Sequence, residues 1–137
     1  MDAASSNRCL SHSPPRGPLP LRHRPFGPWK ESYPLTSDGK IVAVDTSGHV
    51  AGHLALIVHG ESKTGEPTTY FLPGDATYGM DVLDREEPDG INDDPLSALQ
   101  SLKLMKEFAR QTEVVVLPSH DIDTPRFLAE RVVYRPK

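Results

Sequence analysis

The sequence has little cysteine, no long apolar run and no excess of positive charge, and each shortage excludes a class of protein. Cys9 is the single cysteine among 137 residues, so no internal disulfide is expected, and a reducing, cytoplasmic location is favoured. No run of about 18 apolar residues indicates a membrane-spanning helix, and no apolar core of a signal peptide is visible. The formal net charge of −4 argues against a nucleic-acid-binding protein, which usually carries a basic stripe.

What is present divides the chain at about residue 26. The first 25 residues contain four arginines but one acid, Asp2, and seven of the 14 prolines precede Leu35. Proline fixes φ and removes a backbone donor, so we predict that residues 1–25 form a disordered arm. Four prolines between Pro14 and Pro20 also argue against the amphipathic helix of a transit peptide. An alternative is that this arm is a mispredicted or alternative start of a longer protein.

Residues 26–137 are predicted to form one domain of mixed helix and strand. Residues 26–34 form an extended, aromatic-bearing approach, and short apolar strands are predicted at residues 41–44, 54–58, 68–72 and 114–117. Asp94 and Pro95 predict the start of a helix, because aspartate suits the N-cap and proline the first turn. Apolar residues then recur at steps of three and four, which predicts one core-facing stripe: Leu96, Leu99, Leu102, Met105 and Ala109. A shorter helix is predicted from Pro125 to Arg131, and the acidic residues 81–93 are interpreted as a solvated loop.

Three polar motifs each follow a predicted strand: TSGHVAGH at residues 46–53, PGDATY at 73–78 and PSHD at 118–121. Loops at the carboxyl ends of strands are where α/β folds place ligands. Imidazole and carboxylate side chains suit zinc, so His49, Asp75 and His120 are candidate zinc ligands. Each motif alone has a plainer interpretation. A strand-end histidine can be purely structural, Asp75 can be a turn or cap residue, and the glycines can simply form a sharp turn.

The ordered set TSGHVAGH, GDATY and LPSHD resembles the C-terminal half of the metallo-β-lactamase superfamily, and within it the N-acyl-homoserine-lactonase-type hydrolases. This resemblance covers residues 26–137 and implies an α/β (α+β) fold of the αββα type, with a mixed sheet and one or two packing helices. It implies that His49 and His120 each bind one of two zinc ions, that Asp75 bridges them, and that Tyr78 polarises the substrate carbonyl.

Two further residues are assigned supporting roles. His53 resembles the second histidine of the family motif TPGHxxGH, and we interpret it as an orienting hydrogen-bond partner rather than a ligand. Asp121 either fixes the tautomer of the His120 imidazole or merely begins the next turn.

The sequence departs from the family by lacking the HxHxDH motif, which supplies four of the seven expected ligand positions. The upstream histidines, His12 and His23, are isolated in the proline-rich arm. We therefore expect at most one weakly held zinc and only the C-terminal half of the sandwich. Half a sandwich leaves an apolar sheet face exposed, which favours self-association.

Two functional hypotheses follow. The first is a zinc-dependent hydrolase that opens a lactone or ester with metal-bound hydroxide, weak or inactive in this truncated chain, with a small-molecule lactone or ester as its partner. The second is a non-catalytic metallo-β-lactamase-like remnant that acts as an interaction module. Neither involves nucleic acid or a membrane.

Overall fold

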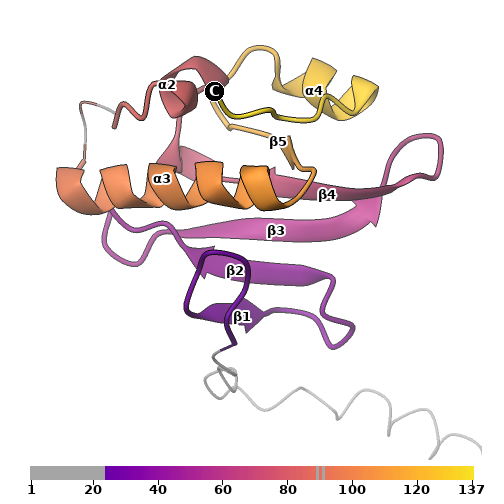
Figure 1. Cartoon of the computed structure of the whole chain (residues 1–137), viewed down its shortest axis with the longest axis horizontal. Coiled ribbons are helices and arrows are strands. Elements are labelled where there is room, and N and C mark those ends of the chain that lie inside the picture. Colours follow the sequence, from indigo (N-terminus) through magenta and orange to yellow (C-terminus); the bar gives the residue numbers. More distant parts are fainter. Residues whose placement is uncertain (1–23, 89, 91) are drawn as a thin grey trace, which may run out of the picture.

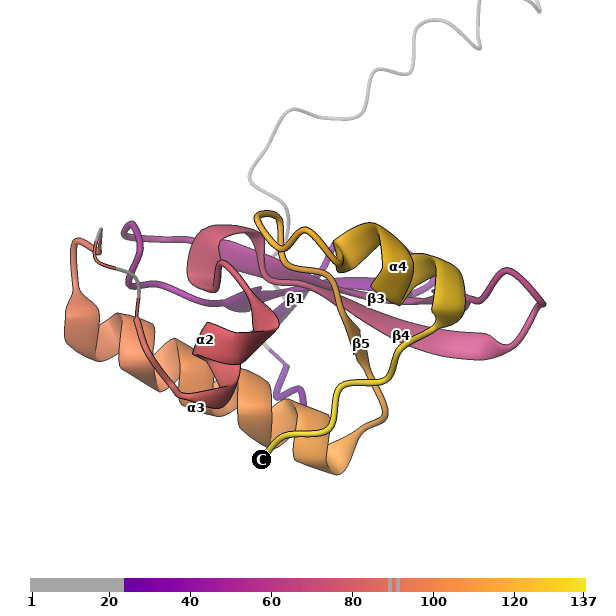
Figure 2. The same cartoon turned by 90° about the horizontal axis from the view of Figure 1, so that it is seen from above.

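The computed structural model describes residues 24–88, 90 and 92–137, which form a five-stranded mixed sheet with helices on both of its faces (Figures 1 and 2). In chain order the elements are β1 (Ser32–Pro34), β2 (Ile41–Asp45), β3 (Leu54–Glu61), β4 (Pro67–Leu72), the short 3-10 helix η1 (Gly74–Ala76), α2 (Met80–Asp84), α3 (Pro95–Gln111), β5 (Val115–Val116) and α4 (Thr124–Glu130). The predicted disorder of the N-terminal arm, with Cys9, His12 and His23, lies outside the described residues except for Arg24 and Pro25.

The sheet follows the chain order, β1-β2-β3-β4-β5. The pairs β1–β2, β2–β3 and β3–β4 are antiparallel, and β5 runs parallel to β4. Strands β2, β4 and β5 therefore point in the same direction, and their carboxyl ends meet at one edge of the sheet. This topology decides which loops come together.

One face of the sheet packs against α3 and forms the core. Val42, Ile57 and Phe71 lie in register on this face and are at most 5% exposed. Phe108 of α3 packs on Phe71 with ring centroids 6.2 Å apart, and Trp29 stacks on Phe71 at 6.0 Å. Phe26 and Trp29 thus extend the core, and the last part of the 26–34 segment adds strand β1.

Helix α3 begins where the sequence predicts. The Asp94 carboxylate accepts a hydrogen bond from the Ser97 backbone N–H at 3.1 Å, and Pro95 occupies the first turn. The predicted apolar stripe is partly wrong. Leu102 and Met105 are buried, whereas Leu96 is 81% exposed. Each step of three residues turns the stripe back by about 60°, so Leu96 lies on the opposite side of the helix from Met105.

The other face of the sheet is only partly covered. Helix α4 lies on this side, as Figure 2 shows, and Arg131 at its end donates to Thr68 Oγ1 at 2.8 Å. Along the rest of this face, Leu54 is 48% exposed and Leu72 is 36% exposed, and Leu56 between them is half-buried. An apolar strip therefore lies at the start of β3 and the end of β4, on the side away from α3.

The interpretation of residues 81–93 as a solvated loop is wrong at its start. Helix α2 occupies Met80–Asp84, and Leu83 is fully buried in the core. The Lys106 side chain of α3 is also buried and donates to the Asp84 carbonyl at 2.9 Å, while forming an ion pair with Glu86 at 3.3 Å. The buried side chain of Leu83 and the contacts of Lys106 therefore hold the start of the acidic segment against α3.

Among the described residues, no helix is long and apolar enough to cross a membrane.

Candidate functional site

The three polar motifs meet at the edge where β2, β4 and β5 end. His49 lies in the loop after β2, Asp75 lies in η1 directly after β4, and His120 follows β5. Asp75 is central. Its Oδ1 lies 3.0 Å from His120 Nε2, and its Oδ2 lies 3.6 Å from His49 Nε2. The structure therefore brings together all three candidate ligands, with each imidazole facing a different oxygen of one carboxylate.

His49 is the more enclosed of the two histidines. Its side chain is 17% exposed, against 56% for His120. The His49 Nδ1 atom is buried and has no hydrogen-bond partner among the described residues. Leaving a buried ring nitrogen unpaired costs free energy, and such atoms in native structures call for an explanation. The opposite nitrogen, Nε2, is the one that faces Asp75.

Tyr78 lies beside both imidazoles. Its ring centroid is 4.6 Å from that of His120 and 6.2 Å from that of His49. Tyr78 and His120 also line a shallow hollow of about 280 Å³, together with Gly79, Asp81, Val82, Asp121 and Ile122. The tyrosine is therefore within the cluster and borders the open space next to it.

The loop that carries His49 is fixed against the start of α3. The carbonyls of Gly48 and His49 accept the backbone N–H groups of Asp94 and Asp93, at 3.0 and 3.2 Å. Gly48 has a φ of 141°, and a Cβ there would lie 2.3 Å from the backbone of Ala98. Glycine is thus required at this point, because the loop backbone contacts the helix directly.

His53 connects this loop to the Asp75 turn. Its Nδ1 lies 2.7 Å from Thr46 Oγ1, and its Nε2 accepts the Asp75 backbone N–H at 3.3 Å. Burial lowers the pKa of His53 below its usual value, and the nearby Asp75 carboxylate only partly opposes this. A neutral His53 is consistent with Nε2 acting as an acceptor. His53 is thus hydrogen-bonded to the backbone of Asp75, one of the candidate ligands.

Asp121 has backbone partners. One carboxylate oxygen accepts the Met80 N–H at 3.1 Å, and the other accepts the Asp123 N–H at 2.9 Å. These bonds join the loop after β5 to the start of α2. Of the two roles considered for Asp121, turn formation matches this geometry.

Within the described part of the chain, no group of three or more His, Cys, Asp or Glu side chains is arranged to hold a metal ion by itself. The cluster consists instead of two carboxylate–imidazole pairs that share Asp75. Two zinc ligands at about 2.05 Å, separated by a tetrahedral angle, lie roughly 3.3 Å apart. The observed separations are 3.0 and 3.6 Å, and the shorter contact is a hydrogen bond between His120 Nε2 and Asp75 Oδ1.

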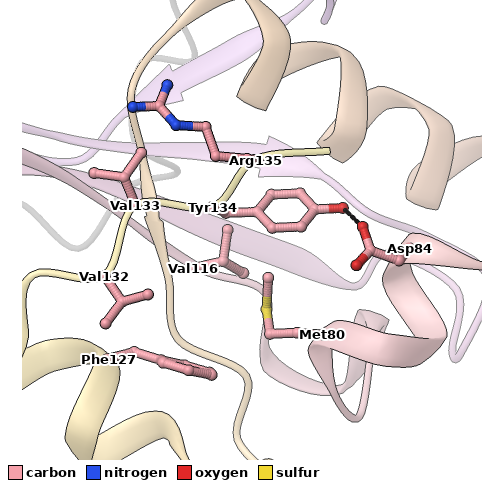
Figure 3. Close-up of a pocket in the computed structure, with 8 residues that line it drawn as sticks. All are labelled: Met80, Asp84, Val116, Phe127, Val132, Val133, Tyr134 and Arg135. Atoms are coloured by element: carbon pink, nitrogen blue, oxygen red, sulfur yellow. Dashed lines mark hydrogen bonds between the residues drawn. The ribbon is translucent and has the colours of Figure 1, made fainter. Parts of the chain in front are cut away.

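A separate pocket of about 190 Å³ was not foreseen from the sequence (Figure 3). It lies between α2, α4 and the C-terminal tail, with Met80, Val116 and Phe127 among its apolar lining. Tyr134 donates to Asp84 Oδ1 at 2.6 Å, and burial together with this bond raises the pKa of Tyr134. None of the predicted site residues lines this pocket. Its polar residues come from the segment interpreted as a loop and from the tail, where no motif marks them.

No protein-family model matches the chain. Among curated proteins, the N-acyl homoserine lactonase AttM of Rhizobium radiobacter is 24% identical over 97 residues, which are 71% of this chain and 35% of that protein.

Solved structures that match this chain also include N-acyl homoserine lactone hydrolases. A structure of an N-acyl homoserine lactone hydrolase, with the product N-hexanoyl-L-homoserine bound at its catalytic metal center, matches with 26% identity and a TM-score of 0.57. A B. thuringiensis AiiA variant with N-decanoyl-L-homoserine at its active site matches equally well. Each match covers 69% of this chain and 35% of the other. A quorum-quenching N-acyl homoserine lactone lactonase matches with 27% identity and a TM-score of 0.52, over 61% of this chain and 33% of that one.

These matches confirm the resemblance to metallo-β-lactamase-type lactonases and the mixed α+β architecture over part of their fold. The chain spans about a third of the length of the proteins it matches.

Proposed function

We propose that this chain carries part of the active site of a zinc-dependent hydrolase that opens lactones or related esters. The observation that supports the proposal most is the convergence of His49 and His120 on the two carboxylate oxygens of Asp75. The similarity to N-acyl homoserine lactonases supports a lactone as the substrate class. The single cysteine leads us to place the protein in the cytoplasm.

Zinc is favoured by the chemistry of the donors. Imidazole nitrogen and carboxylate oxygen are common zinc ligands. His49, Asp75 and His120 would together hold the metal. When bound, zinc lowers the pKa of water and polarises a carbonyl group, so hydrolysis can proceed at neutral pH.

The residues around these ligands have separate tasks in ring opening. Water adds to the carbonyl carbon, the ring C–O bond breaks, and a hydroxy acid forms. Tyr78 borders the hollow beside His120, where its hydroxyl would donate to the carbonyl oxygen as negative charge develops there. Asp75 would orient the reacting water, and the chain needs no covalent nucleophile.

Activity of this chain alone is expected to be weak. Catalytic zinc usually has three protein ligands and one open position, and His49, Asp75 and His120 supply at most three. The HxHxDH motif, which supplies four further ligands in the resembled family, does not occur in the sequence. We therefore expect at most one zinc ion per chain, held less tightly than in a complete site.

Proton release during the opening of an N-acyl homoserine lactone, with and without zinc, tests the proposal. The full chain is assayed first, and then a chimera that joins it to the HxHxDH-bearing part of a lactonase. We expect slow zinc-dependent opening by the chain, much faster opening by the chimera, and loss of both in Asp75→Ala. A folded, zinc-loaded chimera that opens neither lactones nor esters would refute the proposal.

A second candidate function is a non-catalytic interaction module. The exposed apolar strip formed by Leu54, Leu56 and Leu72 on the face away from α3 favours it. We propose a second copy of the chain as the occupant, because the same strip on two copies can pack sheet against sheet and cover both.

A further inference from the structure

Thr46 and His53 lie at the two ends of the loop that carries His49. Their backbones are joined by a hydrogen bond from the Thr46 N–H to the His53 carbonyl at 2.9 Å. The Thr46 side chain is 1% exposed, and its Oγ1 lies 2.7 Å from His53 Nδ1 and 3.4 Å from the His53 carbonyl oxygen. The hydroxyl therefore has two neighbours on the same residue.

The directions of these bonds follow from the other side of the ring. The Asp75 backbone N–H points at His53 Nε2 at 3.3 Å, so Nε2 must be the unprotonated, accepting nitrogen. A neutral imidazole with an unprotonated Nε2 carries its proton on Nδ1. Nδ1–H then donates to Thr46 Oγ1, and the threonine hydroxyl donates its own proton to the His53 carbonyl. In this arrangement each donor has an acceptor.

The ring is also held sterically against the turn that contains Asp75. Gly74 has a φ of 59°, and a Cβ at this position would lie 3.0 Å from His53 Nε2. The imidazole thus packs on the Gly74 backbone while accepting the amide of the next residue. A shift of this ring would move the peptide that carries the Asp75 carboxylate.

We propose that Thr46 is a positioning residue for the metal site. Its hydroxyl accepts the Nδ1–H of His53 and fixes the position of the ring, and His53 in turn holds the Asp75 peptide so that the carboxylate lies between His49 and His120. This inference rests on the proposed function. It also assigns the Nε2 lone pair of His53 to the Asp75 amide, so His53 is not a metal ligand.

The test combines nitrogen NMR of the histidine rings with zinc affinity. Spectra of the metal-free chain at neutral pH should show His53 protonated at Nδ1 alone, with the signals assigned by comparison with His53→Gln. Thr46→Val removes the hydroxyl at nearly constant shape, and Thr46→Ser keeps it as the matched control. Thr46→Val leaves the His53 Nδ1–H without its acceptor, so we expect it to shift the His53 Nδ1 signal and to weaken zinc binding by roughly tenfold to a hundredfold. Thr46→Ser should retain the wild-type signal and the wild-type zinc affinity.

Three results would overturn the inference. They are an Nε2–H tautomer in the wild-type chain, wild-type zinc affinity in folded Thr46→Val, and a change in the His53 Nε2 signal on zinc addition that shows zinc bound to this nitrogen. The His53 tautomer is measured in the wild-type chain without metal. It therefore tests the hydrogen bonds that link Thr46, His53 and Asp75 even if Thr46→Val fails to fold. If the wild-type chain shows the Nδ1–H tautomer but binds no zinc, the link between Thr46, His53 and Asp75 stands as a structural element and its proposed role at a metal is refuted together with the function.

Discussion

At the scale of single residues, Gly48 shows how backbone packing fixes the site. Gly48→Ala places a Cβ 2.3 Å from the backbone of Ala98 and forces a side chain onto a φ of 141°. We expect the free energy of unfolding to fall by about 3 kcal/mol, because both overpacking and backbone strain contribute. Chemical denaturation measures this change.

Gly65→Ala is the matched control. Gly65 also has a positive φ, 85°, but a Cβ there meets nothing within 4 Å. Its substitution should cost about 1 kcal/mol, from backbone strain alone. Equal losses in the two variants would show that the contact with Ala98 is unimportant.

The candidate site could be predicted from the sequence only as far as its motifs extend. His49, Asp75 and His120 each follow a strand, and their meeting requires only that those strands share a direction. The hydrogen bond from the Asp75 amide to His53 spans 22 residues and depends on the tautomer of one ring. No local pattern encodes such a bond, so the way in which His53 acts became visible only in the structure.

At the scale of elements, α3 supports the sheet through one side only. Leu102→Ala should lower the free energy of unfolding by about 3 kcal/mol, because Leu102 is 1% exposed in the core. Leu96→Ala makes the same change on the same helix at an 81% exposed position and should change stability little. Thermal or chemical unfolding of both variants measures the difference, and a larger loss for Leu96→Ala would contradict the assigned helix face.

The N-cap of α3 gives a pH-dependent prediction. The Ser97 hydroxyl and backbone N–H lower the pKa of Asp94 below its ordinary value of 3.8. The lowered pKa means that the ionised cap stabilises the fold above pH 3.8, and this contribution is lost as the pH falls through the folded-state value. Asp94→Ala should therefore lower the melting temperature by roughly 5 °C at pH 7 and by less at pH 3. Asp93→Ala removes the same charge one residue earlier and should have little effect, and a pH-independent loss in Asp94→Ala would argue against the ionised cap.

The start of α3 was predictable because Asp94 and Pro95 form a local signal for a helix N-terminus. Its buried face was predicted less well, since repeated steps of three drift around the helix and carry Leu96 away from the core. Helix α2 was not predicted because it has only five residues, Met80–Asp84, and the burial of Leu83 and Lys106 depends on tertiary contacts.

At the scale of the whole molecule, the uncovered sheet face should govern association. Leu54→Glu places a charge on the apolar strip, where Leu54 is 48% exposed, and should shift the chain toward the monomer in sedimentation experiments. Leu96→Glu introduces the same charge at an exposed leucine on α3 and should leave the oligomeric state unchanged. A wild-type chain that stays monomeric at high concentration would contradict self-association through this face.

The central claim is that His49, Asp75 and His120 form a zinc site, and zinc content per chain tests it most directly. The purified protein is treated with a mild chelator, reloaded with zinc, and measured by elemental mass spectrometry. We predict about one zinc ion per wild-type chain, loss of that zinc in His49→Ala and His120→Ala, and retention in His59→Ala, which removes a histidine within β3. A folded wild-type chain that binds no zinc, or zinc retained in all three variants, would contradict the account.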